Sequence, residues 1–89
     1  MKLWTIVADY KGGTYIDQAL ASTIDAALRD VGSRAEYDFL ASLLDESLET
    51  PVKLDGMKNV WCTTLLFDDE LLLINVVLTA FDEMQPAVG

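Results

Sequence analysis

The stretch from Leu71 to Phe81 constrains the fold most, because it is apolar on both faces of an extended strand. Leu71, Leu73 and Val77 would lie on one face, and the other would carry Leu72, Ile74, Val76, Leu78 and Ala80. Strands that are apolar on both sides are buried on both sides. A small domain with helices on one face of its sheet covers only one of those sides. We therefore expect a second copy of the chain or another protein to cover the other.

Three further segments have the composition of strands. Residues Lys2 to Tyr10 alternate, with β-branched and aromatic side chains predominating, and Thr14 to Ala19 would return after a Gly12-Gly13 turn. Val60 to Phe67 is rich in β-formers, and Asp68-Asp69-Glu70 is a compact polar turn into the last strand. The leucines of 65–78 would also allow a helix, but the two aspartates and the β-branched residues favour strands.

The middle of the chain changes to helical spacing. Ser22-Thr23-Ile24-Asp25 fits a capping box, after which Ile24, Ala27, Leu28 and Val31 repeat at helical intervals. We expect Gly32 to end this helix in a left-handed conformation. A second capping box, Ser33-Arg34-Ala35-Glu36, would begin a longer helix with an apolar face formed by Tyr37, Leu40, Leu44 and Leu48. Pro51 prevents its continuation.

The order strand, strand, helix, helix, strand, strand predicts an α+β fold. We expect a four-stranded antiparallel sheet made of two hairpins, with both helices packed on one face. A length of 89 residues is enough for one core, so residues 1–83 would form a single domain. Residues 84–89 would form a flexible C-terminal tail.

Charge and missing residue types exclude several functions. The chain has 15 Asp and Glu against 6 Lys and Arg, a net charge of −9, and no histidine, yet it is 52% hydrophobic. This composition is typical of a folded domain with a negative surface, which disfavours nucleic acid and anionic membranes as partners. The absence of histidine rules out Ser/His/Asp and Cys/His catalysis. A lone Cys62 and the lack of a recognisable leader predict a cytoplasmic protein.

No motif predicts a cofactor, a metal or a catalytic residue. Paired carboxylates are the remaining groups that could act in catalysis or bind a metal. Asp68-Asp69-Glu70, however, lacks the ligand spacing of a calcium loop. A glycosidase needs a cleft that a chain of this size has little material to build. Cys62, between Trp61 and Thr63, is expected to be a half-buried packing residue. We therefore expect a non-catalytic protein.

Candidate partner-binding residues are the acids that cluster in sequence and the tyrosines that flank the first turn. Acids at the C-terminal end of a helix are unfavourable for the helix dipole, and they are either a solvated last turn or a patch for a basic partner. Core packing is the first explanation for the large aromatics of the strands, but tyrosine is enriched in binding hot spots. Because Tyr10 and Tyr15 lie near the tip of the hairpin, we expect these two to be the exposed pair. The full set is Asp45, Glu46, Glu49, Asp68, Asp69, Glu70, Tyr10 and Tyr15.

Three functional hypotheses are compatible with these patterns. The first is a module that binds a basic protein surface, for example an antagonist of the immunity or inhibitor type. The second is a homodimer, or another homo-oligomeric scaffold or accessory subunit, that uses the apolar last strand as its interface. The third is a nucleic-acid mimic, with carboxylates spaced like phosphates, that blocks a DNA-binding protein.

Overall fold

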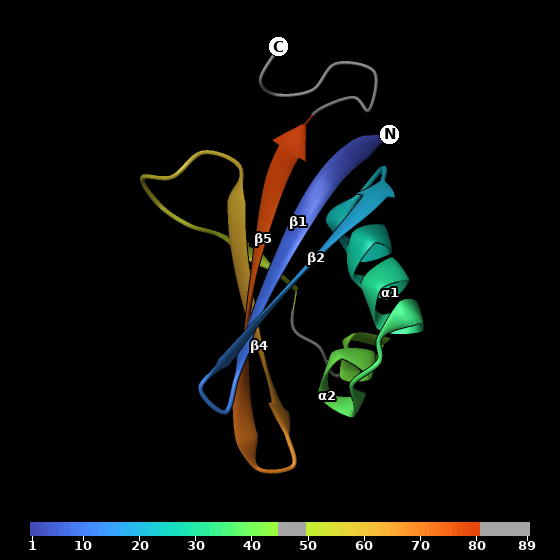
Figure 1. Ribbon diagram of the computed structural model, residues 1–89. Helices are drawn as coiled ribbons and strands as arrows, with labels where there is room; N and C mark the ends of the chain where they lie inside the picture. Colours follow the sequence, from blue (N-terminus) through green and yellow to red (C-terminus); the bar gives the residue numbers. More distant parts are fainter. Residues whose placement is uncertain (45–49, 81–89) are drawn as a thin grey trace.

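The computed structural model describes residues 1–44 and 50–80, and its centre is a five-stranded antiparallel sheet (Figure 1). The strands are β1 (Lys2–Tyr10), β2 (Gly13–Ala21), β3 (Val52–Lys53), β4 (Val60–Phe67) and β5 (Glu70–Ala80), in the order β2-β1-β5-β4-β3. Helices α1 (Ile24–Arg34) and α2 (Asp38–Ala41) lie on one side of this sheet. The hairpins β1-β2 and β4-β5 are joined by pairing of β1 with β5, so the doubly apolar β5 is an inner strand.

The prediction of a four-stranded sheet in ββααββ order is wrong, because a fifth strand follows the helices. After Pro51 the chain runs beside β4, and Val52 and Lys53 pair with Cys62 and Trp61. The N–H of Leu54 continues this pairing by donating to the carbonyl of Val60 at 3.0 Å. Two residues are too few to produce an alternating pattern, so this strand has no signal in the sequence.

Both hairpins close through two-residue turns with left-handed backbone. Lys11 and Gly12 have φ of 49° and 80°, and Asp68 and Asp69 have φ of 52° and 63°. Two consecutive positive φ values define the type I′ turn, whose twist matches that of paired strands. The predicted turns at both places are confirmed, although Gly13 belongs to β2 and Glu70 to β5 rather than to the turns.

The helices differ from the predicted ones at three points. Thr23, not Ser22, caps α1, because its hydroxyl accepts the N–H of Ala26 at 3.2 Å. The helix does not stop at Gly32 but continues to Arg34, and Ser33 donates to the carbonyl of Asp30 instead of capping a second helix.

The second helix is short in the described part of the chain. It comprises the single turn α2, followed by a 3₁₀ turn at Ser42–Leu44, and the rest of the predicted helix falls partly on residues 45–49, outside the described residues. The predicted tail, 84–89, also lies outside them.

The core lies between the sheet and the helices. The side chains of Ile6, Leu72, Ile74 and Val76 are at most 1% exposed. At one end of this layer the indole N–H of Trp4 donates to the carbonyl of Ala21 at 3.0 Å.

Four aromatic rings, those of Tyr10, Tyr15, Phe39 and Phe67, lie at the end of the core near the hairpin turns, and the exposed ring of Tyr37 borders them. Tyr10 stacks on Phe39 with centroids 4.4 Å apart, and its hydroxyl donates to the carbonyl of Phe67 at 3.1 Å. Tyr15 lies 4.8 Å from Phe39 and 5.2 Å from Tyr37. The cluster therefore ties both hairpin ends to α2.

Gly32 has a packing role that the capping interpretation did not anticipate. A Cβ at this position would lie 3.0 Å from Cγ of Leu44 and 3.3 Å from Cβ of Leu43. Such contacts are closer than normal packing allows, so α1 approaches the 3₁₀ turn closely because residue 32 has no side chain.

We expect Gly32→Ala to lower the free energy of unfolding by about 1 kcal/mol, measured by urea denaturation. Alanine in a helix interior normally gains up to about 1 kcal/mol over glycine, but overpacking costs about 1–3 kcal/mol. In a Leu44→Ala background most of the crowding is gone, so the same substitution should stabilise the protein. A loss of equal size in both backgrounds would contradict the steric explanation.

Candidate protein-interaction surface

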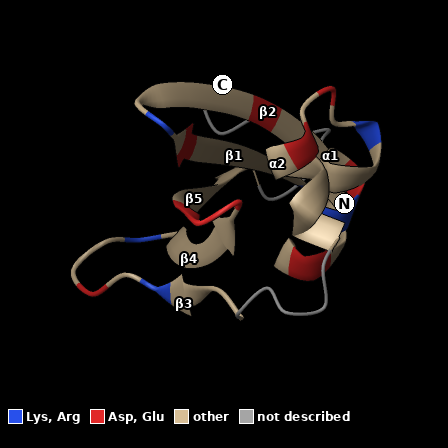
Figure 2. Cartoon of the chain, turned by 90° about the horizontal axis from the view of Figure 1, so that it is seen from below, with Lys and Arg blue, Asp and Glu red and all other residues tan. Residues whose placement is uncertain are grey.

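The face of the sheet opposite the helices is the most extensive candidate site. Strand register places alternate residues of every strand on this open face, and Figure 2 shows the helices confined to the other side. No described helix or strand covers it. Its residues are Leu3, Thr5, Val7, Asp9, Thr14, Ile16, Gln18, Leu20, Val52, Val60, Cys62, Thr64, Leu66, Leu71, Leu73, Asn75, Val77 and Thr79.

The open face is almost uncharged and exposes several large apolar side chains. Ile16, Leu66 and Val52 are 67%, 69% and 68% exposed, and Leu71 is 56% exposed. Asp9 is the one charged residue among those described on this face. Exposed apolar side chains that gather on one face of a domain are typical of a binding site.

Apart from Asp9, the acids of the described chain lie elsewhere. They are Asp17 on β2 and residues on the helices, the connecting segments and the β4-β5 turn (Figure 2). Asp25 and Asp30 lie on α1, and Glu36 and Asp38 lie where α1 passes to α2. The charged side chains of residues 1–44 and 50–80 are therefore distributed around this face, with Asp9 as the exception, rather than over the whole surface.

Polar side chains on the open face bond to one another. The amide of Gln18 donates to Oγ1 of Thr5 at 2.9 Å, and Thr5 shares a 2.5 Å hydrogen bond with Thr79. At the rim Thr14 donates to the carboxylate of Asp9 at 2.6 Å. Since these groups already have partners, covering them does not leave them unsatisfied, which would cost about 1–3 kcal/mol each.

The predicted acidic residues occupy separate places. Asp68, Asp69 and Glu70 are exposed at the β4-β5 turn. Asp45, Glu46 and Glu49 lie outside the described residues.

The two tyrosines differ from the expected exposed pair. Tyr10 is 8% exposed, so the expectation that it is available at the surface is wrong: its ring is stacked on Phe39 and its hydroxyl is bonded. Tyr15 is half-buried beside Tyr37. Cys62 is also half-buried, within the open face.

Sequence reasoning recognised the apolar outer side of the last strand but not the extent of the face. The signal was present in β1, where Leu3 and Val7 make the second face apolar too, and in Ile16 and Leu20 of β2. Joining these positions into one surface required the strand order, because β1 had to be placed beside β5.

No other kind of site emerges from the described residues. Within 1–44 and 50–80, no three Asp, Glu or Cys side chains gather closely enough to hold a metal ion. No helix in the same ranges is long and apolar enough to cross a membrane. The chain matches no protein-family model, and comparisons with curated proteins and with solved structures found no match.

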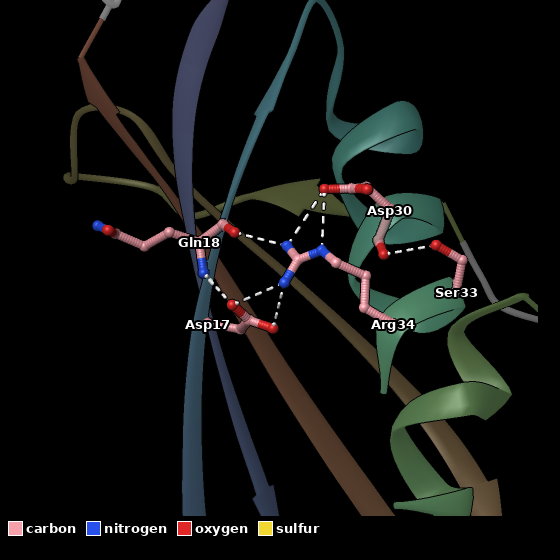
Figure 3. Close-up of polar contacts among 5 residues, drawn as sticks. All are labelled: Asp17, Gln18, Asp30, Ser33 and Arg34. Atoms are coloured by element: carbon pink, nitrogen blue, oxygen red, sulfur yellow. Dashed lines mark hydrogen bonds and ion pairs between the residues drawn. The ribbon is translucent and has the colours of Figure 1, made fainter. Parts of the chain in front are cut away.

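A guanidinium group covers part of the sheet edge formed by β2. Arg34 of α1 donates to the carboxylate of Asp17 at 3.1 Å, to that of Asp30 at 3.2 Å and to the backbone carbonyl of Gln18 at 2.7 Å (Figure 3). The hydrogen bond to Asp30, together with Asp17, raises the pKa of Arg34 against the opposing effect of burial. The outward N–H of Gln18 also has a partner, the carboxylate of Asp17 at 2.8 Å.

This arrangement blocks edge-to-edge association at one position of β2. Exposed strand edges are templates for pairing with another chain, and charged groups that occupy them suppress aggregation. The side chain of Arg34 is 43% exposed, so its ion pairs contribute little to stability. We infer that its main effect is to cover Gln18.

We expect Arg34→Met to aggregate faster than the wild-type chain at equal concentration, measured by light scattering. The matched control is Arg29→Met, which breaks the exposed 3.2 Å ion pair to Asp25 on the same helix and removes the same charge. The control should behave like the wild type. Equal acceleration by both variants would mean that net charge, not the covered edge, limits aggregation.

Proposed function

We propose that this chain is a non-catalytic protein-binding module that dimerises through its open sheet face and presents its acidic surfaces to a basic protein partner. The observation that carries the proposal is the nearly complete absence of charge from this one face of a chain with net charge −9.

A second copy is the occupant that the charge distribution favours. Two chains of net charge −9 repel each other over most of their surfaces, and an uncharged face is where they can approach at least cost. A basic partner would gain little there, because Asp9 at the rim is the one described acid on this face. A face-to-face pair related by a two-fold axis leaves the helices and their acids on the outside.

The size of the face supports the same conclusion. A strand of nine residues is roughly 30 Å long, and four strands are roughly 19 Å wide, so each copy offers about 600 Å² in projection. Two copies together would bury about 1,200 Å², above the roughly 1,000 Å² expected of a specific interface.

The acids that remain outside would serve the second role of the module. Glu36 and Asp38 between the helices, and Asp68 and Asp69 at the β4-β5 turn, are exposed. Charges of one sign steer association with a surface of the opposite sign, and this effect weakens as salt screens them. A reducing, cytoplasmic setting fits a module whose single thiol, Cys62, lies on the association face.

We expect Val7→Glu to convert the dimer to a monomer, measured by sedimentation velocity at high micromolar protein concentration. Val7 is paired with Ile16 and Asn75 in the middle of the open face, so the new carboxylate would be buried in the interface. A buried unpaired charge costs several kcal/mol, which corresponds to more than about 100-fold in the dissociation constant.

The matched control is Met57→Glu, which adds the same charge at a loop residue that is 56% exposed and outside the paired strands. This variant should remain dimeric. A wild-type chain that sediments as a monomer would overturn the proposed dimer. A Val7→Glu dimer as tight as the wild type would instead place the interface elsewhere.

A further inference from the structure

The outer edge of β2 carries backbone groups whose direction follows from the hairpin. Tyr10 and Gly13 close a two-residue turn, so they exchange both backbone hydrogen bonds. Bonded and non-bonded pairs then alternate, and Ala8 with Tyr15 and Ile6 with Asp17 are also bonded pairs. The N–H and C=O groups of the even-numbered residues of β2 therefore point away from β1. The bond from Arg34 to the carbonyl of Gln18 agrees with this assignment.

The outward backbone groups of β2 have hydrogen-bond partners among the described residues at Gln18, but not at Thr14 and Ile16, which we call the bare edge. Both backbone groups of Gln18 have partners, Arg34 and Asp17. For Thr14 and Ile16, no hydrogen bond from another described residue reaches the outward backbone groups. Together they offer two donors and two acceptors at the spacing of an antiparallel ladder.

A cavity of about 460 Å³ adjoins this bare edge. Thr14, Tyr15, Ile16 and Asp17 line one side, and the segment from Arg34 to Tyr37 lines the other. Ala35 and Tyr37 have extended backbone, with ψ of 135° and 138°, so this segment is an extended wall facing the strand. Leu40, which is half-buried, contributes apolar surface, whereas Ile6 and Val31 border the cavity but are only 1% exposed.

The charges around the cavity favour a cationic side chain. Arg34 already forms ion pairs with Asp17 and Asp30, and the carboxylate of Glu36 is also close to the cavity. The side chains around the cavity therefore carry one positive charge and three negative charges. Glu36 is exposed, and the ring of Tyr37, 49% exposed, lies 5.2 Å from that of Tyr15. A lysine or arginine would there meet both a carboxylate and aromatic faces.

We propose that the edge of β2 at Thr14 and Ile16 binds an extended segment of a partner protein as an additional strand, with alternating apolar and basic side chains. A residue opposite Ile16 exchanges both backbone hydrogen bonds with it and projects its side chain on the open-face side. Its neighbours, opposite Tyr15 and Asp17, project toward the helices and into the cavity. Main-chain bonds thus provide affinity, and the cavity selects basic residues at alternate positions. This site is independent of the proposed dimer, because it uses backbone groups at the edge.

The test uses a fluorescein-labelled, capped peptide, Thr-Lys-Val-Lys-Val-Lys-Thr, titrated with the full chain and followed by fluorescence anisotropy. We expect saturable binding, weakened at least tenfold when both valines of the peptide are N-methylated, because methylation removes the N–H that donates to Ile16 and that of the other outward-pairing residue. The peptide with Glu in place of each Lys should not bind detectably. Equal binding of the N-methylated peptide would show contact through charge alone and overturn the added strand.

On the protein, Ile16→Pro should weaken binding at least tenfold, because the N–H that it removes points outward rather than to β1. Proline is tolerated on edge strands in this orientation. The matched control is Leu20→Pro, which removes an outward N–H of the same strand beyond Gln18 and also lies on the open face. It should bind within twofold of the wild type.

A second measurement keeps the proposal testable if either proline variant unfolds. In the wild-type chain, the peptide should slow hydrogen exchange of the Ile16 amide at least tenfold and leave that of Leu20 unchanged. Failure of the lysine peptide to bind, or binding without protection of Ile16, would overturn the proposal. Neither result would bear on whether the chain is a dimer.

Discussion

The structure depends on the antiparallel pairing of β1 with β5. Each hairpin is a local unit, but a two-stranded hairpin is marginal in water, and the pairing of Leu3 to Tyr10 with residues 72–80 merges both into one sheet. It aligns Ile6 and Ala8 with Val76 and Ile74 on the helical side, where all four are at most 1% exposed. The same alignment places Val7 beside Asn75 on the other side. One register therefore produces both the core and the uncharged face.

Local chemistry made much of the sheet predictable. Alternation with β-branched residues located β1 and β4, and Asp68-Asp69 located the second turn because aspartate tolerates left-handed backbone. Prediction failed where tertiary packing overrode a local signal. Gly32 looks like a helix stop, but it is the residue that lets α1 approach Leu43 and Leu44. Val52 and Lys53 form a strand only because the edge of β4 is there to receive them.

The candidate surface was predictable only in part, because it depends on the order of the strands in the sheet. A doubly apolar last strand indicated that something covers its outer side, yet the partners of that strand could not be read from spacing. Tyr10 was predicted to be exposed because it flanks a turn. It is buried because its side chain points to the helical side, where its hydroxyl bonds to the carbonyl of Phe67 on β4. The covered and bare parts of the β2 edge depend on where α1 directs Arg34, and neither periodicity nor composition encodes that geometry.

The position of β5 also has a consequence for the order in which the molecule can assemble during synthesis. The β1-β2 hairpin and α1 are complete once residue 34 has been made, but the inner edge of β1 stays open until residues 72–80 are available. Closing that gap brings together segments about 70 residues apart, a long-range contact of the kind that slows folding. Until β5 has been made, the inner edge of β1 therefore has no partner strand and is a template for pairing with another chain.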